Sequence, residues 1–581
     1  MLAAWPLAFS LGLLPAARGQ DHDTVVAGEL GRELDAYLAT CAVFGFSGCA
    51  LVQQDGQLLL RKGYGLARPD LGTPNTPETL YDIASASKQV TAAAILLLEA
   101  RGELSTDDSI AEHLPGVPRS HREVTLYHLL THTSGFPRGG PSGGGPDLEA
   151  ALSTYFGADR RGRAGERFEY YNGGYAMLAG VVERVTGERF EDWVRENLFE
   201  PAGLAHTDFI ETARVDGARL AGAHDSRRLT TDYIKGWGYK GMGGVLTSVS
   251  DLAVWCNALF AGEILPPEAL AKLLTPFREK YACGWYVFET ERKRTVVQHG
   301  GTAPGFQSYI RYFIDDDVLI LVLTNREGSH WQVAWGLSSI VLDEDPKAAL
   351  PPEIASVSAS DLDAFCGSWE ADGERLFVSR SGTGLRVGGM GTRVLAALSP
   401  SGPGSGRPRN ASSSRPKARE LAAAEERAVA IVAELREGRC DLLGADMLAH
   451  IPKSWPDRIL HQLWPEHVER WGEVRDHRSL GAFFDPASGR TRVWIRLDQA
   501  RGERSVEIAF VGSKLNIFDL KARDFPVEVG VAPIDDRRLV GFDFQNEAPY
   551  ELALRGKGKS RALELRTRGG SKLKFRPEKR R

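Results

Sequence analysis

A serine and a lysine lie three residues apart at the start of a long apolar run, and this arrangement restricts the possible fold more than any other stretch. Ser85 and Lys88 precede residues 89–101, in which apolar side chains predominate until Gly102. Such a run predicts a helix that Gly102 ends. Side chains at positions i and i+3 are neighbours on a helix. The sequence therefore predicts a hydroxyl and an amine on one helix face.

This pair suits nucleophilic chemistry. A serine hydroxyl is a weak nucleophile until a nearby base takes its proton. Lys88 can be that base only if desolvation or a neighbouring cation lowers its pKa. Ser85 also suits the N-terminal cap of the same helix, a position that Ser and Asp favour. Both interpretations of Ser85 are open at this point.

A second motif brings a phenol and an amide. Residues 168–175 read Phe-Glu-Tyr-Tyr-Asn-Gly-Gly-Tyr, so Tyr170 and Asn172 are two positions apart. A tyrosine near two cations has a lowered pKa and can act as a general base. Asn172 is expected to orient Lys88 or a substrate amide. The alternative is a structural role, in which Tyr170 is an aromatic residue in the wall of the site and Asn172 is a turn residue.

A third motif lies between two strand-like stretches. Residues 299–302 read His-Gly-Gly-Thr, with His299 first and Gly301 third. Glycines there let a substrate backbone lie close against an edge strand. A backbone N–H near Thr302, with that of Ser85, would form an oxyanion hole worth on the order of 3 kcal/mol per donor. The alternative is a glycine turn between two hairpin strands.

In this order, Ser-x-x-Lys, Tyr-x-Asn and His-x-Gly resemble the motifs of the serine β-lactamase and penicillin-binding protein superfamily. The branch that holds class C β-lactamases, D-amino-acid peptidases and β-lactamase-fold esterases matches best. Residues 129–135, 243–253 and 284–287 agree with it, and the resemblance covers roughly residues 29–345. It implies an active site that contains Ser85, Lys88, Tyr170, Asn172, His299, Gly301 and Thr302.

The resemblance also implies roles, with one departure. Ser85 would be the nucleophile, and Lys88 and Tyr170 the proton-transfer pair. His299 stands where many relatives have the lysine of Lys-Thr-Gly. A histidine is only partly protonated near neutral pH, so a permanent cation for a β-lactam carboxylate is missing. This departure favours an esterase or D-amino-acid peptidase, with weak or no β-lactamase activity.

The implied fold is α/β in the broad sense (α+β): an antiparallel sheet with flanking helices beside a mostly helical lobe, over residues 29–345. Residues 48–53 and 57–63 alternate around Asp55-Gly56, which predicts a hairpin at the start of that sheet. The helical insert carries the first two motifs, and the third lies on an edge strand facing it. The site is therefore expected in the cleft between the lobes, where ligand pockets commonly form.

The rest of the chain predicts a β-rich region. Short strands over 362–398 resemble the start of a small β-barrel, which strands over 530–577 would complete. Between them, helices followed by strands over 419–525 resemble an NTF2-like α+β fold; one extended C-terminal domain is the alternative. Two connecting segments are expected: a linker over 346–361 and a disordered stretch, rich in Ser, Pro, Gly and Arg, over 399–418.

The chain is expected to be exported. Residues 2–17 are apolar, and small residues stand at positions 17 and 19. This pattern predicts a signal peptide over residues 1–19, cleaved before Gln20, and a secreted or periplasmic protein; a short membrane anchor is the alternative. No later stretch is long and apolar enough to span a bilayer. The net charge of −5 argues against a nucleic-acid partner.

Neither metal nor cofactor is predicted. His128 and His132 are four residues apart but lack an acidic third ligand, and His132 is expected to hydrogen-bond backbone within its own turn. The six cysteines are too few for a disulfide framework; Cys41 and Cys49 are the nearest pair.

The sequence thus predicts an exported serine hydrolase that forms an acyl-enzyme on Ser85. Its substrate would be a small ester, a peptide or a cell-wall fragment. The alternative is a non-catalytic cell-wall or peptide-binding protein of the same fold.

Overall fold

The computed structural model describes residues 24–577 with internal gaps. The predicted signal peptide lies outside the described residues, as does the predicted disordered stretch except for Ala418. The gaps comprise residues 140–144, 146, 213–216, 225–235, 327, 329, 344–350, 353, 373, 382–383, 391–393, 395–417, 446–454, 486–489, 501, 512, 524–526, 544–547, 557–560 and 567–571.

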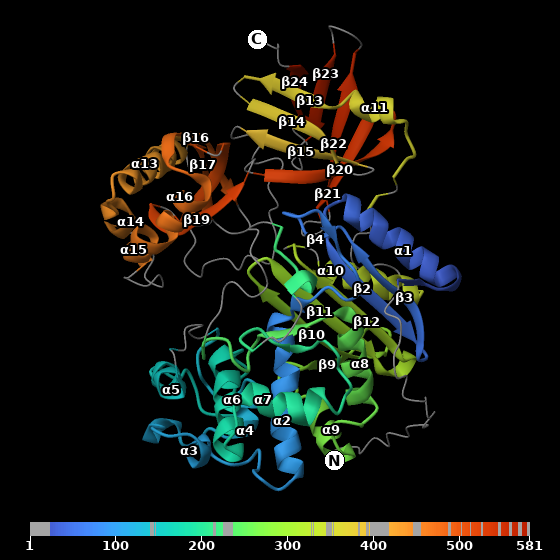
Figure 1. Ribbon diagram of the computed structural model, residues 1–581, viewed down its shortest axis with the longest axis vertical. Helices are drawn as coiled ribbons and strands as arrows, with labels where there is room; N and C mark the ends of the chain where they lie inside the picture. Colours follow the sequence, from blue (N-terminus) through green and yellow to red (C-terminus); the bar gives the residue numbers. More distant parts are fainter. Residues whose placement is uncertain are drawn as a thin grey trace.

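Seven strands form an antiparallel sheet in the main domain, residues 24–343 (Figure 1). The hairpin predicted around Asp55-Gly56 is confirmed, and both residues have the positive φ, 50° and 70°, that a two-residue hairpin turn requires. In sheet order the strands are β1 (Val25–Val26), β3 (Gln57–Tyr64), β2 (Gly48–Gln54), β12 (Val318–Thr324), β11 (Phe306–Phe313), β10 (Thr295–Ala303) and β9 (Tyr286–Glu289).

Helices cover both faces of this sheet, so its central strands are buried on both sides. In β12, Leu319, Leu321 and Leu323 join the core shared with the helical lobe, whereas the alternate residues join the core under α1 (Gly28–Val43) and α10 (His330–Val341). Alternation along a strand sends successive side chains to opposite faces, and here both faces are apolar.

The helical lobe surrounds one nearly fully buried helix, α2 (Lys88–Ala100), which packs against α6 and α9. Residues 92–94 are all alanine, and such small side chains let neighbouring helices approach closely. The other helices of the main domain are α3 (Ile110–His113), α4 (Leu126–Leu130), α5 (Leu148–Phe156), α6 (Asn172–Thr186), α7 (Phe190–Val194), α8 (Val249–Phe260) and α9 (Pro267–Leu274).

Short strands and tight turns complete the main domain. The strands are β4 (Leu66–Arg68), β5 (Thr73–Pro74), β6 (Tyr81–Asp82), β7 (Asp208–Phe209) and β8 (Val245–Thr247). The tight turns are η1 (Ala84–Ser87), η2 (Arg119–His121), η4 (Gly217–Arg219) and η5 (Ile314–Asp316), whereas η3 (Arg195–Phe199) is a π-helical turn that continues α7.

A closed eight-stranded barrel follows α11 (Ala359–Asp363) and packs against α1 (Figure 1). A Cβ on Gly530 would lie 2.3 Å from the Val43 carbonyl oxygen, so this glycine allows the two parts to touch. The strands are β13 (Gly367–Ala371), β14 (Glu374–Ser381), β15 (Gly384–Met390), β20 (Val527–Asp535), β21 (Arg538–Asp543), β22 (Ala548–Arg555), β23 (Ala562–Arg566) and β24 (Lys572–Pro577). The barrel thus draws its strands from two segments of the chain.

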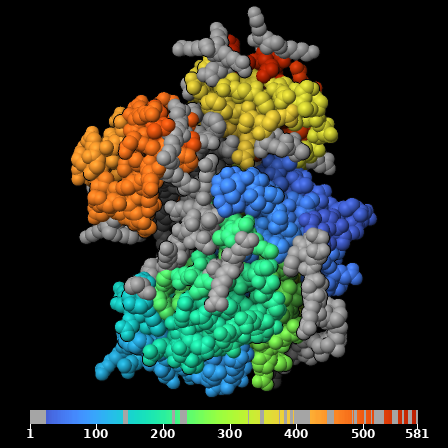
Figure 2. All heavy atoms as spheres, in the orientation of Figure 1, coloured from blue at the N-terminus to red at the C-terminus, as the bar shows by residue number. Residues whose placement is uncertain are grey.

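Between β15 and β20 the chain forms a separate helix-and-sheet unit, the orange surface in Figure 2. Ile431, Val432 and Leu435 of its first helix pack on a four-stranded antiparallel sheet. The elements are α13 (Ala418–Arg436), α14 (Asp441–Ala445), α15 (Trp455–Arg458), η6 (Ile459–Leu463), α16 (Trp464–Trp471), β16 (Val474–Asp485), β17 (Arg490–Gln499), β18 (Gly502–Val511) and β19 (Lys514–Arg523).

The structure also bears on membrane-spanning helices and on the cysteines. None of the described helices is long and apolar enough to cross a membrane. All six cysteines are free, and four of them, Cys41 and Cys49 included, are buried.

Candidate active site

Ser85 lies in the tight turn η1, directly before α2. The residue before it, Ala84, has a φ of 49°, a conformation that costs energy for a residue with a Cβ. Asp82 stabilises this turn: its Oδ1 accepts the Ala84 N–H at 2.7 Å, and its Oδ2 accepts the Tyr239 hydroxyl at 2.7 Å. The strained turn therefore sets the position of Ser85.

The capping interpretation of Ser85 is wrong. Ser87 occupies the N-cap position of α2, and no side chain caps that helix end. The Ser87 hydroxyl instead accepts the Val245 N–H at 3.1 Å. The Ser85 side chain is thus left to interact with Lys88.

Lys88 is completely buried, and its Nζ lies 3.1 Å from Ser85 Oγ and 2.9 Å from the Met242 carbonyl oxygen. Both partners are neutral. Burial lowers the Lys88 pKa well below its ordinary value, because a charged amine loses its hydration there. Lys88 can act as a base only if its pKa is lowered, and desolvation alone lowers it here. Any residue type has a backbone carbonyl, so the sequence carried no signal for Met242.

Tyr170 precedes α6 and hydrogen-bonds to Ser85, and its ring centroid lies 5.0 Å from Lys88 Nζ. The predicted lowering of its pKa is wrong: burial raises the pKa of this phenol well above its ordinary value. The reason is that the ring is enclosed by other aromatic residues, which disfavour a phenolate. Tyr170 is therefore a protonated phenol at neutral pH.

His132 lies against Tyr170, with ring centroids 4.1 Å apart. Its Nδ1 accepts the Tyr171 N–H at 3.1 Å, so the predicted hydrogen bond within its own turn is wrong. The ring is buried, and burial lowers its pKa well below the ordinary value. His132 therefore joins residues 131–135 to the Tyr-x-Asn motif as a neutral side chain.

Asn172 is the first residue of α6, and its backbone N–H donates to the Gly139 carbonyl at 3.1 Å. Its side-chain Oδ1 is buried and has no hydrogen-bond partner among the described residues. The contacts described for Lys88 do not include Asn172. The structure thus shows no contact between Asn172 and Lys88, and pairing of Asn172 with a substrate amide stays a prediction.

His299, Gly301 and Thr302 lie within β10, so the interpretation of 299–302 as a glycine turn is wrong. Strand β9 pairs only with Thr295–Gln298. Residues 299–303 therefore extend beyond the edge strand, where β10 packs against η1.

Gly301 is required for this contact. A Cβ there would lie 2.0 Å from the Ile83 carbonyl oxygen and 2.7 Å from Ser308 Oγ. The glycine thus lets β10 approach the turn that carries Ser85. The approach of a substrate backbone to these glycines stays a prediction. Thr302, the next residue, is exposed.

His299 is 3% exposed, and burial, with a smaller effect from Lys88, lowers its pKa to about 3. Its Nδ1 lies 2.7 Å from the Gly300 carbonyl oxygen, which assigns the proton to Nδ1. The Tyr281 hydroxyl then donates to Nε2 at 3.1 Å. His299 is therefore neutral at physiological pH. The sequence predicted a partly protonated histidine at this position, whereas the lowered pKa leaves the side chain without a charge.

Aromatic rings line one side of the site. Tyr281 is fully buried, with its ring centroid 4.8 Å from that of His132, 4.7 Å from Tyr286 and 5.4 Å from Phe168. Phe168 and Tyr286 remain partly exposed. Tyr281 was missed at the sequence level because it lies outside the three motifs.

The chain matches known proteins over the main domain. A family model described as Beta-lactamase matches residues 34–338. The putative penicillin-binding protein PbpX of Bacillus subtilis (strain 168) is 28% identical over 288 residues, 49% of this chain and 72% of that protein. Penicillin-binding protein 4* of the same organism is 27% identical over 317 residues, 48% of this chain and 68% of that protein.

Solved structures also resemble it. The crystal structure of a penicillin-binding protein from Bacillus halodurans has 25% identity and a TM-score of 0.46, covering 55% of this chain and 99% of that one. The chain belongs to the beta-lactamase family. It is a serine hydrolase of the β-lactamase and penicillin-binding protein superfamily.

Proposed function

We propose that this protein hydrolyses an ester or an amide through an acyl-enzyme on Ser85. The observation that carries the proposal is the 3.1 Å separation between Ser85 Oγ and a Lys88 amine whose pKa burial lowers. A neutral amine at hydrogen-bond distance can accept the serine proton as the hydroxyl attacks a carbonyl carbon. No cofactor enters this reaction.

The two proton-transfer residues take different parts. Lys88 accepts the proton from Ser85, and the protonated Tyr170 phenol, which is hydrogen-bonded to Ser85, donates to the leaving group. Lys88 then returns the proton to Tyr170, whose ring lies 5.0 Å from its amine. Water attacks the acyl-enzyme along the reverse path. This division follows from the opposite shifts in pKa of the two buried groups.

The backbone N–H groups of Ser85 and Thr302 would stabilise the oxyanion. The close approach of Gly301 to Ile83 supports this role, because it brings β10 and the nucleophile turn together. Preorganised donors of this kind contribute on the order of 3 kcal/mol each.

The site favours short esters or D-amino-acid peptides over β-lactams. Neutral His299 offers no permanent charge for a β-lactam carboxylate, whereas the partly exposed rings of Phe168 and Tyr286 suit an apolar acyl group. A cell-wall fragment is a further proposed substrate. Export to a secreted or periplasmic location is proposed from the signal-peptide character of residues 1–19.

The test compares the wild type with Ser85→Ala and with Ser153→Ala, which removes an exposed hydroxyl on α5. We expect saturable hydrolysis of a short activated ester by the wild type and Ser153→Ala, and none by Ser85→Ala. Equal rates in all three proteins would contradict the proposal and favour the binding-protein alternative.

A further inference from the structure

The segment of residues 239–245 holds the amine of Lys88 in place. Its Met242 carbonyl oxygen accepts from Lys88 Nζ at 2.9 Å. One residue earlier, the Gly241 carbonyl oxygen accepts from the Thr91 hydroxyl at 2.7 Å. Both donors belong to α2 and lie one helical turn apart. The position of this segment therefore decides where the buried amine lies relative to the nucleophile.

The same segment bonds to the turn that carries Ser85. The Tyr239 hydroxyl donates to the carboxylate of Asp82, which stabilises that turn. At the other end of the segment, the Val245 carbonyl oxygen accepts the Ile83 N–H at 3.0 Å. A displacement of the segment would therefore shift the hydroxyl and the amine relative to each other.

The backbone of this segment needs support from side chains. Residues 236–244 lie outside the helices and strands, and five of these nine residues are glycine. Glycine loses more conformational freedom on folding than any other residue. Contacts made by the few larger side chains must therefore hold the segment in one conformation.

Lys240 supplies such contacts, two residues before Met242. Its Nζ lies 2.9 Å from Glu183 Oε1 on α6 and 3.0 Å from Glu191 Oε1 on α7. The Lys240 side chain is 9% exposed and that of Glu191 is 3% exposed, so solvent screens this ion pair little. The Lys240 amine also lies 4.4 Å from the centroid of the Trp237 ring, a cation–π contact. Lys240 thus joins the segment to two helices of the lobe.

Two further charged groups lie near this pair. Arg189 Nη2 is 3.6 Å from Glu191 Oε2, but the Arg189 side chain is 57% exposed. The Glu211 carboxylate accepts the Gly236 N–H, and burial raises its pKa. An exposed guanidinium is screened by solvent and does not belong to the segment. Arg189 therefore could not replace Lys240 as the link between the segment and the helices.

We propose that Lys240 is a positioning residue for the hydrolysis. Through its two ion pairs it holds the Met242 carbonyl against the amine of Lys88, and so keeps that amine beside the nucleophile and away from water. Lys240 acts through Met242 and is not itself a catalytic residue. This inference rests on the proposed role of Lys88 as the base.

The test replaces Lys240 by methionine, which removes the charge and keeps an unbranched side chain. The pKa of Lys88 would be measured by NMR in protein labelled with ¹³C at the lysine ε carbons, with Lys88→Met to assign the signal. We expect Lys240→Met to raise the Lys88 pKa by about one pH unit or more, because a displaced segment lets water reach the amine. We expect kcat/KM for an activated ester to fall about tenfold or more. Lys240→Arg, which keeps the charge, should restore most of both values.

Glu183→Gln is a milder variant that also serves if Lys240→Met folds poorly. Glu183 is partly exposed, and its Oε1 accepts the Phe190 N–H at 3.0 Å, a bond that a glutamine oxygen can keep. Only one of the two ion pairs of Lys240 is then lost. We expect both quantities to change in the same direction as in Lys240→Met, by a smaller amount.

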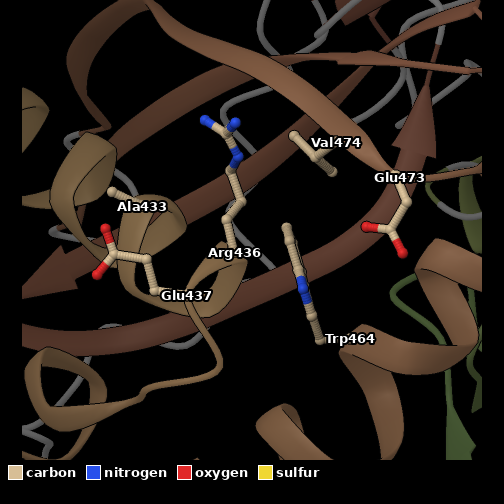
Figure 3. A pocket seen from close by; sticks show the side chains of 6 residues that line it. All are labelled: Ala433, Arg436, Glu437, Trp464, Glu473 and Val474. Atoms are coloured by element: carbon tan, nitrogen blue, oxygen red, sulfur yellow. The ribbon is translucent and has the colours of Figure 1, made fainter.

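Two control variants remove a cation elsewhere in the chain. Lys62→Met breaks the 2.7 Å ion pair with Asp35, which joins β3 to α1 in the same domain. Arg436→Met removes a cation that, like Lys240, lies near a tryptophan, but in the helix-and-sheet unit. There it lines a pocket of about 310 Å³ (Figure 3) with Ala433, Glu437, Trp464, Glu473 and Val474. We expect the Lys88 pKa and kcat/KM of the wild type in both controls.

The outcomes separate positioning from stability. An unchanged Lys88 pKa in Lys240→Met, even with a lower thermal midpoint, would assign Lys240 a structural role alone and overturn the proposal. An equal rise of the Lys88 pKa in Lys62→Met would overturn it as well. Equal ester hydrolysis by the wild type and Ser85→Ala would contradict the proposed function instead. The titration of Lys88 needs no turnover and would still decide whether Lys240 positions that amine.

Discussion

The core that the main sheet shares with the helical lobe and the core of the barrel differ in what they bury. The core of the main domain contains Lys88, His132 and His299, each almost fully enclosed. In the barrel, Glu374 is the one buried polar or charged side chain among the described residues, and its Oε2 accepts the Val394 N–H at 2.8 Å. Burying ionisable groups costs stability, so a fold accumulates them where they serve chemistry. The described core of the barrel is thus built almost entirely from apolar side chains.

Replacing the buried amine should have the largest effect and should act on chemistry alone. We expect Lys88→Met to lower kcat/KM for an activated ester by about 10²–10⁴-fold, since proton transfer loses its base. The thermal midpoint should stay the same or rise, because methionine fills the space without a desolvated amine. Steady-state kinetics and a thermal melt on the same preparation give both values.

An active Lys88→Met variant would show that the buried amine is structural. A large fall in the thermal midpoint of Lys88→Met would show that the buried amine contributes to stability, and would contradict the proposed difference between the two cores.

Truncating the largest barrel side chain should give the opposite result. Trp369 is fully buried, and its Nε1 donates to the Phe365 carbonyl at 2.9 Å. We expect Trp369→Ala to lower the unfolding free energy of the barrel by about 3–5 kcal/mol, with kcat unchanged while the protein is folded. Denaturant unfolding and ester kinetics provide the measurement.

Leu71→Ala, at a position 67% exposed in the main domain, is the control and should shift stability by less than about 0.5 kcal/mol. A loss of kcat in Trp369→Ala comparable to that in Lys88→Met would mean that the barrel takes part in catalysis.

Lowering the pH should destabilise the main domain more than the barrel, with a smaller effect than either substitution. Burial lowers the pKa of His299 to about 3 and that of His330 to about 4, and lowers that of His132 well below its usual value. Below about pH 6.5 these histidines become protonated in the unfolded chain but stay neutral in the folded protein. The free energy of unfolding therefore falls as the pH falls toward the native pKa values. Each histidine contributes about 1.4 kcal/mol per pH unit.

The strands of the barrel contain no histidine. Protection factors, the intrinsic exchange rate at each pH divided by the observed rate, should therefore fall in β10 and β12 between pH 6.5 and 5, while those in β22 and β23 change little. His299→Asn should reduce the pH slope in the main domain by up to about 1.4 kcal/mol per pH unit. An equal pH dependence in both regions would contradict the assigned histidine environments.

The site could be predicted from the sequence only where a motif is local. Ser85 and Lys88 are neighbours because one turn and helix carry both, and the hairpin around Asp55-Gly56 follows from its turn residues. The Tyr170 pKa was mispredicted because a sequence shows which residue types are present but not which are buried around a phenol.

Two other parts of the site depend on tertiary contact. The Met242 carbonyl that holds Lys88 is 154 residues away in the chain, and every residue has such a carbonyl. The role of Gly301 was assigned to substrate binding, whereas its nearest neighbour is the Ile83 carbonyl on another element. Neither contact leaves a pattern in the chain.

Trapping the acyl-enzyme tests the central claim most directly. The wild type would be mixed with an activated ester, quenched in acid within the first turnover, digested and examined by mass spectrometry. The account predicts one acyl group per chain, on the peptide that contains Ser85, with none in Ser85→Ala and slow formation in Lys88→Met. An acyl group on another residue, or turnover without any acylated peptide, would contradict it.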